Sequence, residues 1–242
     1  AIARMDRLDD DLGLDTIETG ATIAVAMEAG IIPFGDTAGA LRLLDEVRRG
    51  TPLGRLIASG AEVLGRTYGI ERIPTVKGQS MPAYDPRAIQ GIGVTYATST
   101  MGADHTAGYA VTANVLSVGG KVDPLRPEGQ VELSRNLQIA TTAIDTTGLC
   151  LFVAFAVLDN PAALEGICEM LSGHHGRRVT ADDFLALGTR TLAVERGFNK
   201  AVGYTAAHDR LPDFFRTEKL PPHNITFAVS DEELDQVFAG IG

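Results

Sequence analysis

Cysteine is scarce in this chain, which has only Cys150 and Cys168 among its 242 residues. Two cysteines cannot build the disulfide framework of a small secreted protein, so we expect a reducing, cytoplasmic compartment. Long apolar runs are also lacking, because the longest, residues 149–158, is about half of what a bilayer crossing needs. No basic and then apolar leader stands at the start of the sequence. We therefore expect no membrane partner.

Positive charge is also in short supply. The chain has 21 Lys and Arg against 31 Asp and Glu, which gives a net charge of −10. Phosphate backbones need clustered basic residues, so this balance argues against a nucleic-acid partner. The length is sufficient for one large domain or two small ones with a sizeable core. The first residue is Ala on a segment with a helical pattern, and we expect that this is not the natural start of the protein.

Strand-like alternation never lasts long enough to indicate a sheet, whereas helical spacing recurs along most of the chain. We therefore predict an all-α, multihelical fold of two packed helical domains. Asp36 is expected to cap one helix and Gly50 to end it. A capping box at Thr180–Asp183 opens another helix. The further predicted helices are residues 15–29, 60–68 and 128–142, then 149–158 and 161–171 as buried helices; the proline-containing tail is expected to be extended.

A proline-rich segment, residues 73–86, cannot form one helix and is expected to be an ordered loop at the domain boundary. We assign residues 1–75 to part of a first helical domain and residues 76–242 to a second. The stretch that follows, residues 90–100, is dominated by small side chains. Such residues either let backbones approach closely or leave room for a bulky ligand.

A short motif, D-x-x-G-L followed by Asp or Cys, occurs once in each predicted domain, at residues 10–15 and 145–150. Its Gly permits a tight, left-handed turn, and the N–H groups beyond that turn are expected to be free for a ligand. The Asp carboxylate can accept hydrogen bonds from a flat heterocycle that carries N–H groups, such as a pterin. The alternative is purely structural, with Asp as a helix cap and Gly as a stop signal.

With these two motifs, further blocks make the chain resemble the tungsten-containing aldehyde:ferredoxin oxidoreductases. The matching blocks run in family order from about residue 4 to about residue 215. They include PAYDPR (82–87), GIGVTYATS (91–99), GADH (102–105), ERGFN (195–199) and DRLP (209–212).

The resemblance implies a tungsten bis-pyranopterin (molybdopterin) cofactor beside a 4Fe–4S cluster. It also implies that these are the C-terminal helical domains of the family fold, each giving one motif to one pterin. Cys150 would then be the fourth thiolate ligand of the cluster. The residues that would bind the pterins are Asp10, Gly13, Leu14 and Asp15 for one, and Asp145, Gly148 and Leu149 for the other.

The resemblance also assigns two catalytic residues. His105 would lie beside the tungsten as hydrogen-bond donor or proton relay, and a neutral imidazole suits proton transfer at pH 7. Tyr84 matches a position that faces the substrate pocket in some members. Without the resemblance, a lone His is more often structural, and a structural role for the loop Tyr is as plausible as a functional one.

The implied partners are ferredoxin as electron acceptor, a small aldehyde as substrate, and an N-terminal domain or subunit that this sequence lacks. A homodimer is also compatible with the sequence. A 4Fe–4S cluster needs four thiolates, and the other three, with the expected catalytic Glu, lie upstream in the family. We therefore expect this chain to be inactive alone. Two alternatives stay open: a tungsten subunit like that of benzoyl-CoA reductase, and a non-catalytic helical module that docks a separate N-terminal subunit.

Overall fold

The computed structural model describes residues 1–241, and its contacts divide the chain into two compact units. Unit 1 comprises Ala1–Ala83 with Pro212–Phe214, and unit 2 comprises Tyr84–Leu211 with Phe215–Gly242. Helices dominate both units, and the only strands within residues 1–241 form the small antiparallel hairpin of β1 (Thr75–Val76) and β2 (Gln79–Ser80). The predicted all-α fold class is confirmed. The predicted domain boundary after residue 75 stays a prediction.

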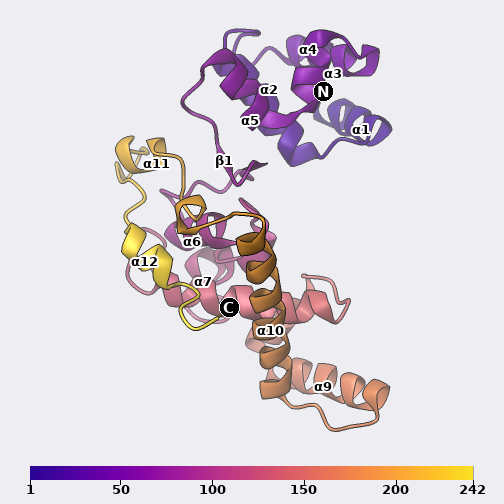
Figure 1. Ribbon diagram of the computed structural model, residues 1–242, viewed down its shortest axis with the longest axis vertical. Coiled ribbons are helices and arrows are strands. Elements are labelled where there is room, and N and C mark those ends of the chain that lie inside the picture. The colour runs from indigo at the N-terminus through magenta and orange to yellow at the C-terminus, as the bar shows by residue number, and fades with distance from the viewer. Residues whose placement is uncertain (242) are drawn as a thin grey trace. The chain divides into compact units, whose positions relative to one another are not determined.

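Unit 1 is a cluster of short helices around an apolar core (Figure 1). Asp36 caps α3 through its carboxylate, and Gly50 ends that helix in the left-handed conformation, as predicted. Helix α4 was not predicted; Thr51 caps it, and it begins at a proline, a favoured first helical residue. The helices are α1 (Ile2–Leu12), α2 (Thr16–Glu28), α3 (Thr37–Arg49), α4 (Pro52–Ala58) and α5 (Gly60–Tyr68).

Glu18 links three elements of unit 1. Its carboxylate on α2 accepts hydrogen bonds from the N–H of Ala61 on α5, and from both the N–H and the hydroxyl of Ser80 on β2, each at 2.9 Å. A charged acceptor with several donors makes stronger bonds than a neutral one. Glu18 therefore holds α2, which follows the first motif, against the rest of its unit.

Unit 2 holds the remaining helices, and α10 crosses α7 within it (Figure 1). The capping box between Thr180 and Asp183 opens α10 as predicted. The elements are α6 (Gln90–Thr98), η1 (Thr106–Gly108), η2 (Thr112–Leu116, π-helical), α7 (Gln130–Thr146), α8 (Val153–Asp159), α9 (Pro161–His175), α10 (Ala181–Ala201), η3 (Ala206–His208), α11 (Phe214–Thr217) and α12 (Asp231–Gln236).

The small-residue stretch forms α6, which is buried along its whole length. A Cβ on Gly91 would meet the side chains of Asn114 and Gln130 at 2.6 Å, and one on Gly93 would meet Phe227 at the same distance. Of the two roles left open for these small residues, the structure shows close packing.

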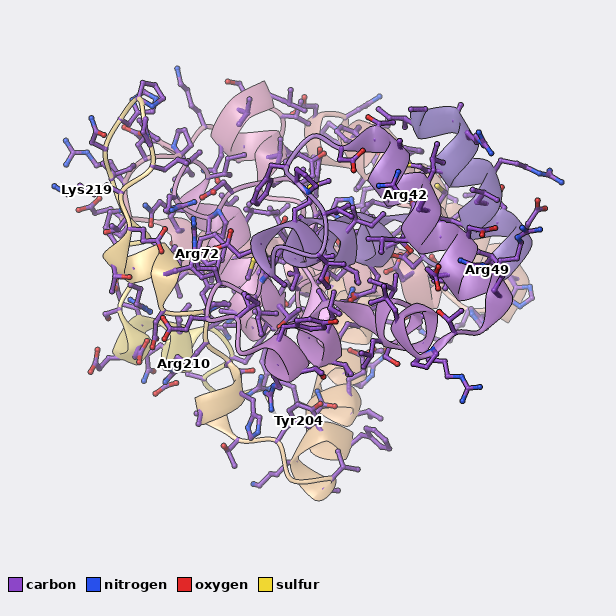
Figure 2. The ribbon with its side chains drawn as sticks, turned by 90° about the horizontal axis from the view of Figure 1, so that it is seen from above. Arg42, Arg49, Arg72, Tyr204, Arg210 and Lys219 are labelled. Carbon is purple, nitrogen blue, oxygen red and sulfur yellow. The ribbon has the colours of Figure 1, made fainter. Side chains whose placement is uncertain are left out.

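Two predictions about helices were wrong. Helix α8 has no buried residue, and Phe152 just before it is 79% exposed, so an apolar run alone did not indicate burial. The tail is not wholly extended, because it contains α11 and α12, the latter opened by a capping box of Ser230 and Glu233. Arg210 lies beside α12 (Figure 2) and pairs with Asp231 at 3.1 Å and Asp235 at 2.8 Å.

None of the helices within residues 1–241 is long and apolar enough to cross a lipid bilayer.

The crossing of α7 and α10 depends on Gly188, where an added Cβ would collide with the main-chain carbonyl of Ile139. We expect Gly188→Ala to lower the free energy of unfolding by about 1–3 kcal/mol or more, because a backbone atom cannot move aside cheaply. Gly197→Ala in the same helix is the matched control, since nothing lies within 4 Å of its added Cβ. It should be neutral or stabilise by up to about 1 kcal/mol. Urea denaturation of both variants measures the difference, and equal effects would contradict this account of the crossing.

Candidate cofactor-binding and catalytic site

The first motif ends α1 with a left-handed glycine. Gly13 has a φ of 70°, and its N–H donates to the carbonyl of Asp10 at 3.3 Å. The N–H of Leu14 donates to the carbonyl of Asp9 at 2.8 Å. These two bonds define a Schellman motif, the commonest way in which a helix ends at glycine.

The second motif ends α7 in the same way. Gly148 has a φ of 76°, and its N–H donates to the carbonyl of Asp145 at 2.9 Å. The N–H of Leu149 donates to the carbonyl of Ile144 at 3.3 Å. The sequence repeat is therefore also a repeat of backbone structure, with one copy in unit 1 and one in unit 2.

This geometry corrects one expectation. The N–H groups of Leu14 and Leu149 are not free for a ligand, because each closes its helix end. Within residues 1–241 the N–H groups of the next residues, Asp15 and Cys150, donate no hydrogen bond. The available donors therefore lie one residue later than predicted.

The carboxylates of the motifs divide into two kinds. One oxygen of Asp15 accepts the N–H of Glu18 at 2.7 Å, so this residue caps α2. Asp10 and Asp145 are exposed, and within residues 1–241 their carboxylates make no hydrogen bond or ion pair. These two carboxylates can accept hydrogen bonds from a ligand, as a pterin edge would require.

The two helix ends differ one residue before the motif. Asp9 is 3% exposed, and its Oδ1 has no hydrogen-bond partner within residues 1–241, whereas Ile144 holds the same place in α7 and belongs to an apolar core. Burial raises the pKa of Asp9, and the neighbouring carboxylates of Asp6, Asp10 and Asp15 raise it further. The residue directly before the first motif is thus a buried acid, Asp9, whereas the residue before the second is aliphatic, Ile144.

Unit 2 gathers several sequence blocks around the second motif. Partial desolvation of the carboxyl raises the pKa of Asp145 even though the residue is exposed by surface area, and the negative charges of Asp104 and Glu195 raise it further. Glu195 accepts the hydroxyl of Thr100 at 2.7 Å, and Asn199 donates to the carbonyl of Thr100 at 2.8 Å. Two of the blocks noted in the sequence therefore lie close to Asp145.

The two cysteines do not form a metal site. Cys150 is exposed, whereas Cys168 is buried in α9, where burial raises the pKa of its thiol. The residues of this chain therefore do not fit a 4Fe–4S cluster by themselves, since four thiolates are needed and Cys150 offers one. No group of three or more His, Cys, Asp or Glu side chains within residues 1–241 is placed to hold a metal ion. A metal held by pterin sulfurs would require no such group.

His105 and Tyr84, the two predicted catalytic residues, lie together in unit 2. Their ring centroids are 5.6 Å apart and the rings are tilted by 31°. The His105 side chain is 24% exposed, and its Nδ1 lies 3.6 Å from Oδ1 of Asp104. The proposed catalytic pair is thus one partly exposed cluster rather than two separate residues.

Tyr109 belongs to the same cluster, and the sequence analysis missed it. Its hydroxyl is hydrogen-bonded to that of Tyr84 at 2.8 Å, and its ring contacts His105 edge-on with centroids 5.9 Å apart. Burial and the Tyr84 hydroxyl raise the pKa of Tyr109 to about 12. No feature of the sequence pointed to it, because the 3₁₀ turn η1 between His105 and Tyr109 is what brings the two rings together.

A partly buried ion pair holds the segment that carries Tyr84. Arg87 is 7% exposed and binds both oxygens of Asp85, at 3.0 and 2.7 Å. Its guanidinium also donates to the carbonyl of Glu218 and lies over the ring of Phe215. A bidentate pair of this kind fixes geometry as well as charge, so the PAYDPR block positions Tyr84 through Asp85 and Arg87.

Comparisons with known proteins agree with the motifs. Residues 1–239 match the family model "Aldehyde ferredoxin oxidoreductase, domains 2 & 3". The chain is similar to proteins named tungsten-containing aldehyde ferredoxin oxidoreductase from three archaea. It is 32% identical to the one from Pyrococcus furiosus over 238 residues, covering 91% of this chain and 38% of that protein. It is 31% identical to the one from Thermococcus kodakarensis over 229 residues, covering 88% of this chain and 37% of that protein. It is 30% identical to the one from Pyrococcus horikoshii over 240 residues, covering 91% of this chain and 39% of that protein.

The raised pKa of Tyr109 predicts a pH dependence of stability. The unfolded chain loses this proton near pH 10 and the folded chain near pH 12, so the free energy of unfolding should fall as the pH rises through this window. Tyr109→Phe should make that fall smaller and should remove the tyrosinate absorbance that appears near pH 12. Tyr68→Phe, at an exposed position, is the control and should leave both unchanged. An unaltered titration near pH 12 in Tyr109→Phe would refute the assignment.

Proposed function

The chain belongs to the aldehyde ferredoxin oxidoreductase family, and we propose that it forms the helical part of a tungsten enzyme that oxidises aldehydes to carboxylic acids and reduces ferredoxin. The chain spans 38% of the length of the Pyrococcus furiosus relative. The activity is therefore proposed for the complete protein, in which a further domain or subunit supplies the rest of the site. This helical part alone is proposed to be inactive.

The observation that carries the proposal is the pair of matched helix ends. Each presents an exposed, unpaired carboxylate, Asp10 or Asp145, in the last turn of a helix. A negative charge is unfavourable there because the helix dipole is also negative at that end. A residue that costs stability at two equivalent places supports a binding role, and N–H groups of a ligand would offset the repulsion.

We therefore propose that each helix end binds one pterin of a bis-pyranopterin tungsten cofactor. Asp10 and Asp145 would accept hydrogen bonds from the two heterocycles. Asp15, Gly13 and Leu14 would complete the first site, and Gly148 and Leu149 the second. Cys150 would offer one thiolate to a 4Fe–4S cluster whose other ligands come from outside this chain.

The cluster of His105, Tyr84 and Tyr109 would transfer protons and donate hydrogen bonds to the substrate. Converting an aldehyde and water into a carboxylic acid releases two protons and two electrons, and the bound tungsten would supply the two-electron redox chemistry. His105 can take up a proton at neutral pH. Tyr84, whose hydroxyl Tyr109 holds, can donate a hydrogen bond to a substrate oxygen.

The two alternative functions have no observation in their favour. A subunit like that of benzoyl-CoA reductase and a non-catalytic docking module stay predictions from the sequence. The relatives to which the chain is similar carry the aldehyde ferredoxin oxidoreductase name. We therefore retain ferredoxin, a small aldehyde and a missing N-terminal part as the proposed partners.

The pterin-binding role can be tested in the complete protein, which should contain tungsten and reduce ferredoxin with an aldehyde. We expect Asp10→Asn and Asp145→Asn to lower tungsten and pterin content at least severalfold, because an amide loses a charge-assisted acceptor worth about 1.5–3 kcal/mol. Asp11→Asn is the matched control, since Asp11 is exposed and paired only with Arg7, an interaction worth about 0–1 kcal/mol. Full tungsten content in both motif variants would remove the helix ends from cofactor binding.

The proton-transfer role can be tested by His105→Ala in the same protein. General acid–base catalysis contributes about 10²–10⁴-fold, so turnover should fall by roughly that factor. Tungsten content, measured by elemental analysis, should stay at the wild-type value because His105 does not hold the cofactor. Wild-type turnover in this variant would exclude His105 from the mechanism.

A further inference from the structure

The imidazole of His105 has one buried nitrogen without a hydrogen bond. Nδ1 is buried and makes no hydrogen bond within residues 1–241. Nε2 also has no such bond there but is not among the buried, unpaired atoms. A buried polar atom without a partner destabilises the fold, so an acceptor close to Nδ1 is of interest.

That acceptor is the carboxylate of Asp104. Its Oδ1 lies 3.6 Å from Nδ1, and the side chain is only 12% exposed. The N–H of Thr106 donates to Oδ1 at 3.0 Å, and the Thr106 hydroxyl donates to Oδ2 at 2.6 Å. These two bonds hold the carboxylate in place, with Oδ1 facing the imidazole.

The imidazole has little freedom to find another partner. The rings of Tyr84 and Tyr109 flank it, with centroids 5.6 and 5.9 Å away, and their hydroxyls are engaged with each other. The distance between Nδ1 and Asp104 is slightly longer than a hydrogen bond. Such bonds are often long before substrate and cofactor are bound and shorten in the assembled site.

We propose that Asp104 is the positioning residue of His105. Its carboxylate accepts the Nδ1 proton, so that the lone pair lies on Nε2, the nitrogen that is not buried. Nε2 is then the atom that takes up a proton during turnover, and Asp104 stabilises the imidazolium that results. This inference rests on the proposed proton-transfer role of His105. It adds a residue whose block was noted in the sequence but to which no role was given.

The charges around this pair favour the same arrangement. Asp145 on α7 lies close enough to Asp104, and to Glu195 on α10, to be repelled by both carboxylates. Tyr84 and Tyr109 are the titratable groups against the His105 ring itself. Asp104 is the carboxylate that lies 3.6 Å from the imidazole, so its negative charge is the one that would favour a positive ring.

The tautomer of His105 tests the proposal directly. In the complete protein with ¹⁵N-labelled histidine, the NMR signals that disappear in His105→Ala belong to His105. We expect the wild-type signals to show the proton on Nδ1 and Asp104→Ala to lose that preference. Asp104→Ala should also lower kcat about tenfold or more with little change in KM, as expected of a group that orients a proton acceptor.

Asp104→Asn is the isosteric variant, because its amide oxygen can still accept the N–H of Thr106 and preserve the turn. Removal of the charge should shift the acidic limb of the kcat–pH profile to lower pH, since the imidazolium loses stabilisation. Asp159→Asn is the control and should leave tautomer and profile unchanged. Like Asp104, Asp159 is a carboxylate of unit 2 that accepts a backbone N–H, in this case that of Gly119. Its hydrogen bond differs in being exposed and in joining residues that are far apart in the sequence.

The outcomes separate the two proposals. A wild-type His105 protonated on Nε2, or an Asp104→Ala variant with unchanged tautomer and kcat, would overturn the positioning role. An unshifted profile in Asp104→Asn would overturn the stabilisation of the imidazolium. If the complete protein oxidises no aldehyde, the proposed function fails, but the NMR spectra still decide whether Asp104 orients His105.

Discussion

A left-handed glycine at the end of a helix is the constraint on which the candidate site depends. Gly13 and Gly148 each reverse the chain so that two N–H groups close the helix with carbonyls of its last turns. Any side chain is strained in this conformation, so glycine keeps both turns identical. At each turn, the carboxylate of Asp10 or Asp145 and the N–H of Asp15 or Cys150, which is free within residues 1–241, lie at the same end of the helix. Two stretches of different sequence therefore present the same backbone turn with an exposed carboxylate, although one continues with Asp15 and the other with Cys150.

The second constraint is close packing in unit 2. Gly91 and Gly93 let α6 lie fully buried, and Gly188 lets α10 pass directly over the backbone of α7. This packing leaves little freedom to the segments that follow α6 and carry His105. The crossing of α7 and α10 also places Asp145 where the negative charges of Asp104 and Glu195 act on it.

Much of the fold could be predicted from local sequence. The caps at Asp36, Gly50 and Thr180 act within one or two helical turns, so the residues that form them are neighbours in the chain. The prediction failed where burial mattered. The run after Cys150 is apolar but only partly buried in this structure, since hydrophobicity does not say what covers a helix. The predicted site residues could be named from their motifs, whereas their hydrogen-bond partners could not.

The sequence by itself determined the helical class, the two matched motifs and the family, because these depend on residue types at short, fixed spacings. The N–H groups of Leu14 and Leu149 are already used, and this too is a local feature, because each bonds to a carbonyl five residues earlier in its own helix. Only the tertiary structure decided that Tyr109 holds Tyr84 and that Asp104 faces a buried nitrogen of His105. The physical reason is that each such contact forms only when the distance between donor and acceptor is right to within tenths of an ångström. Distances on that scale are set by how helices pack and not by the order of residues along the chain.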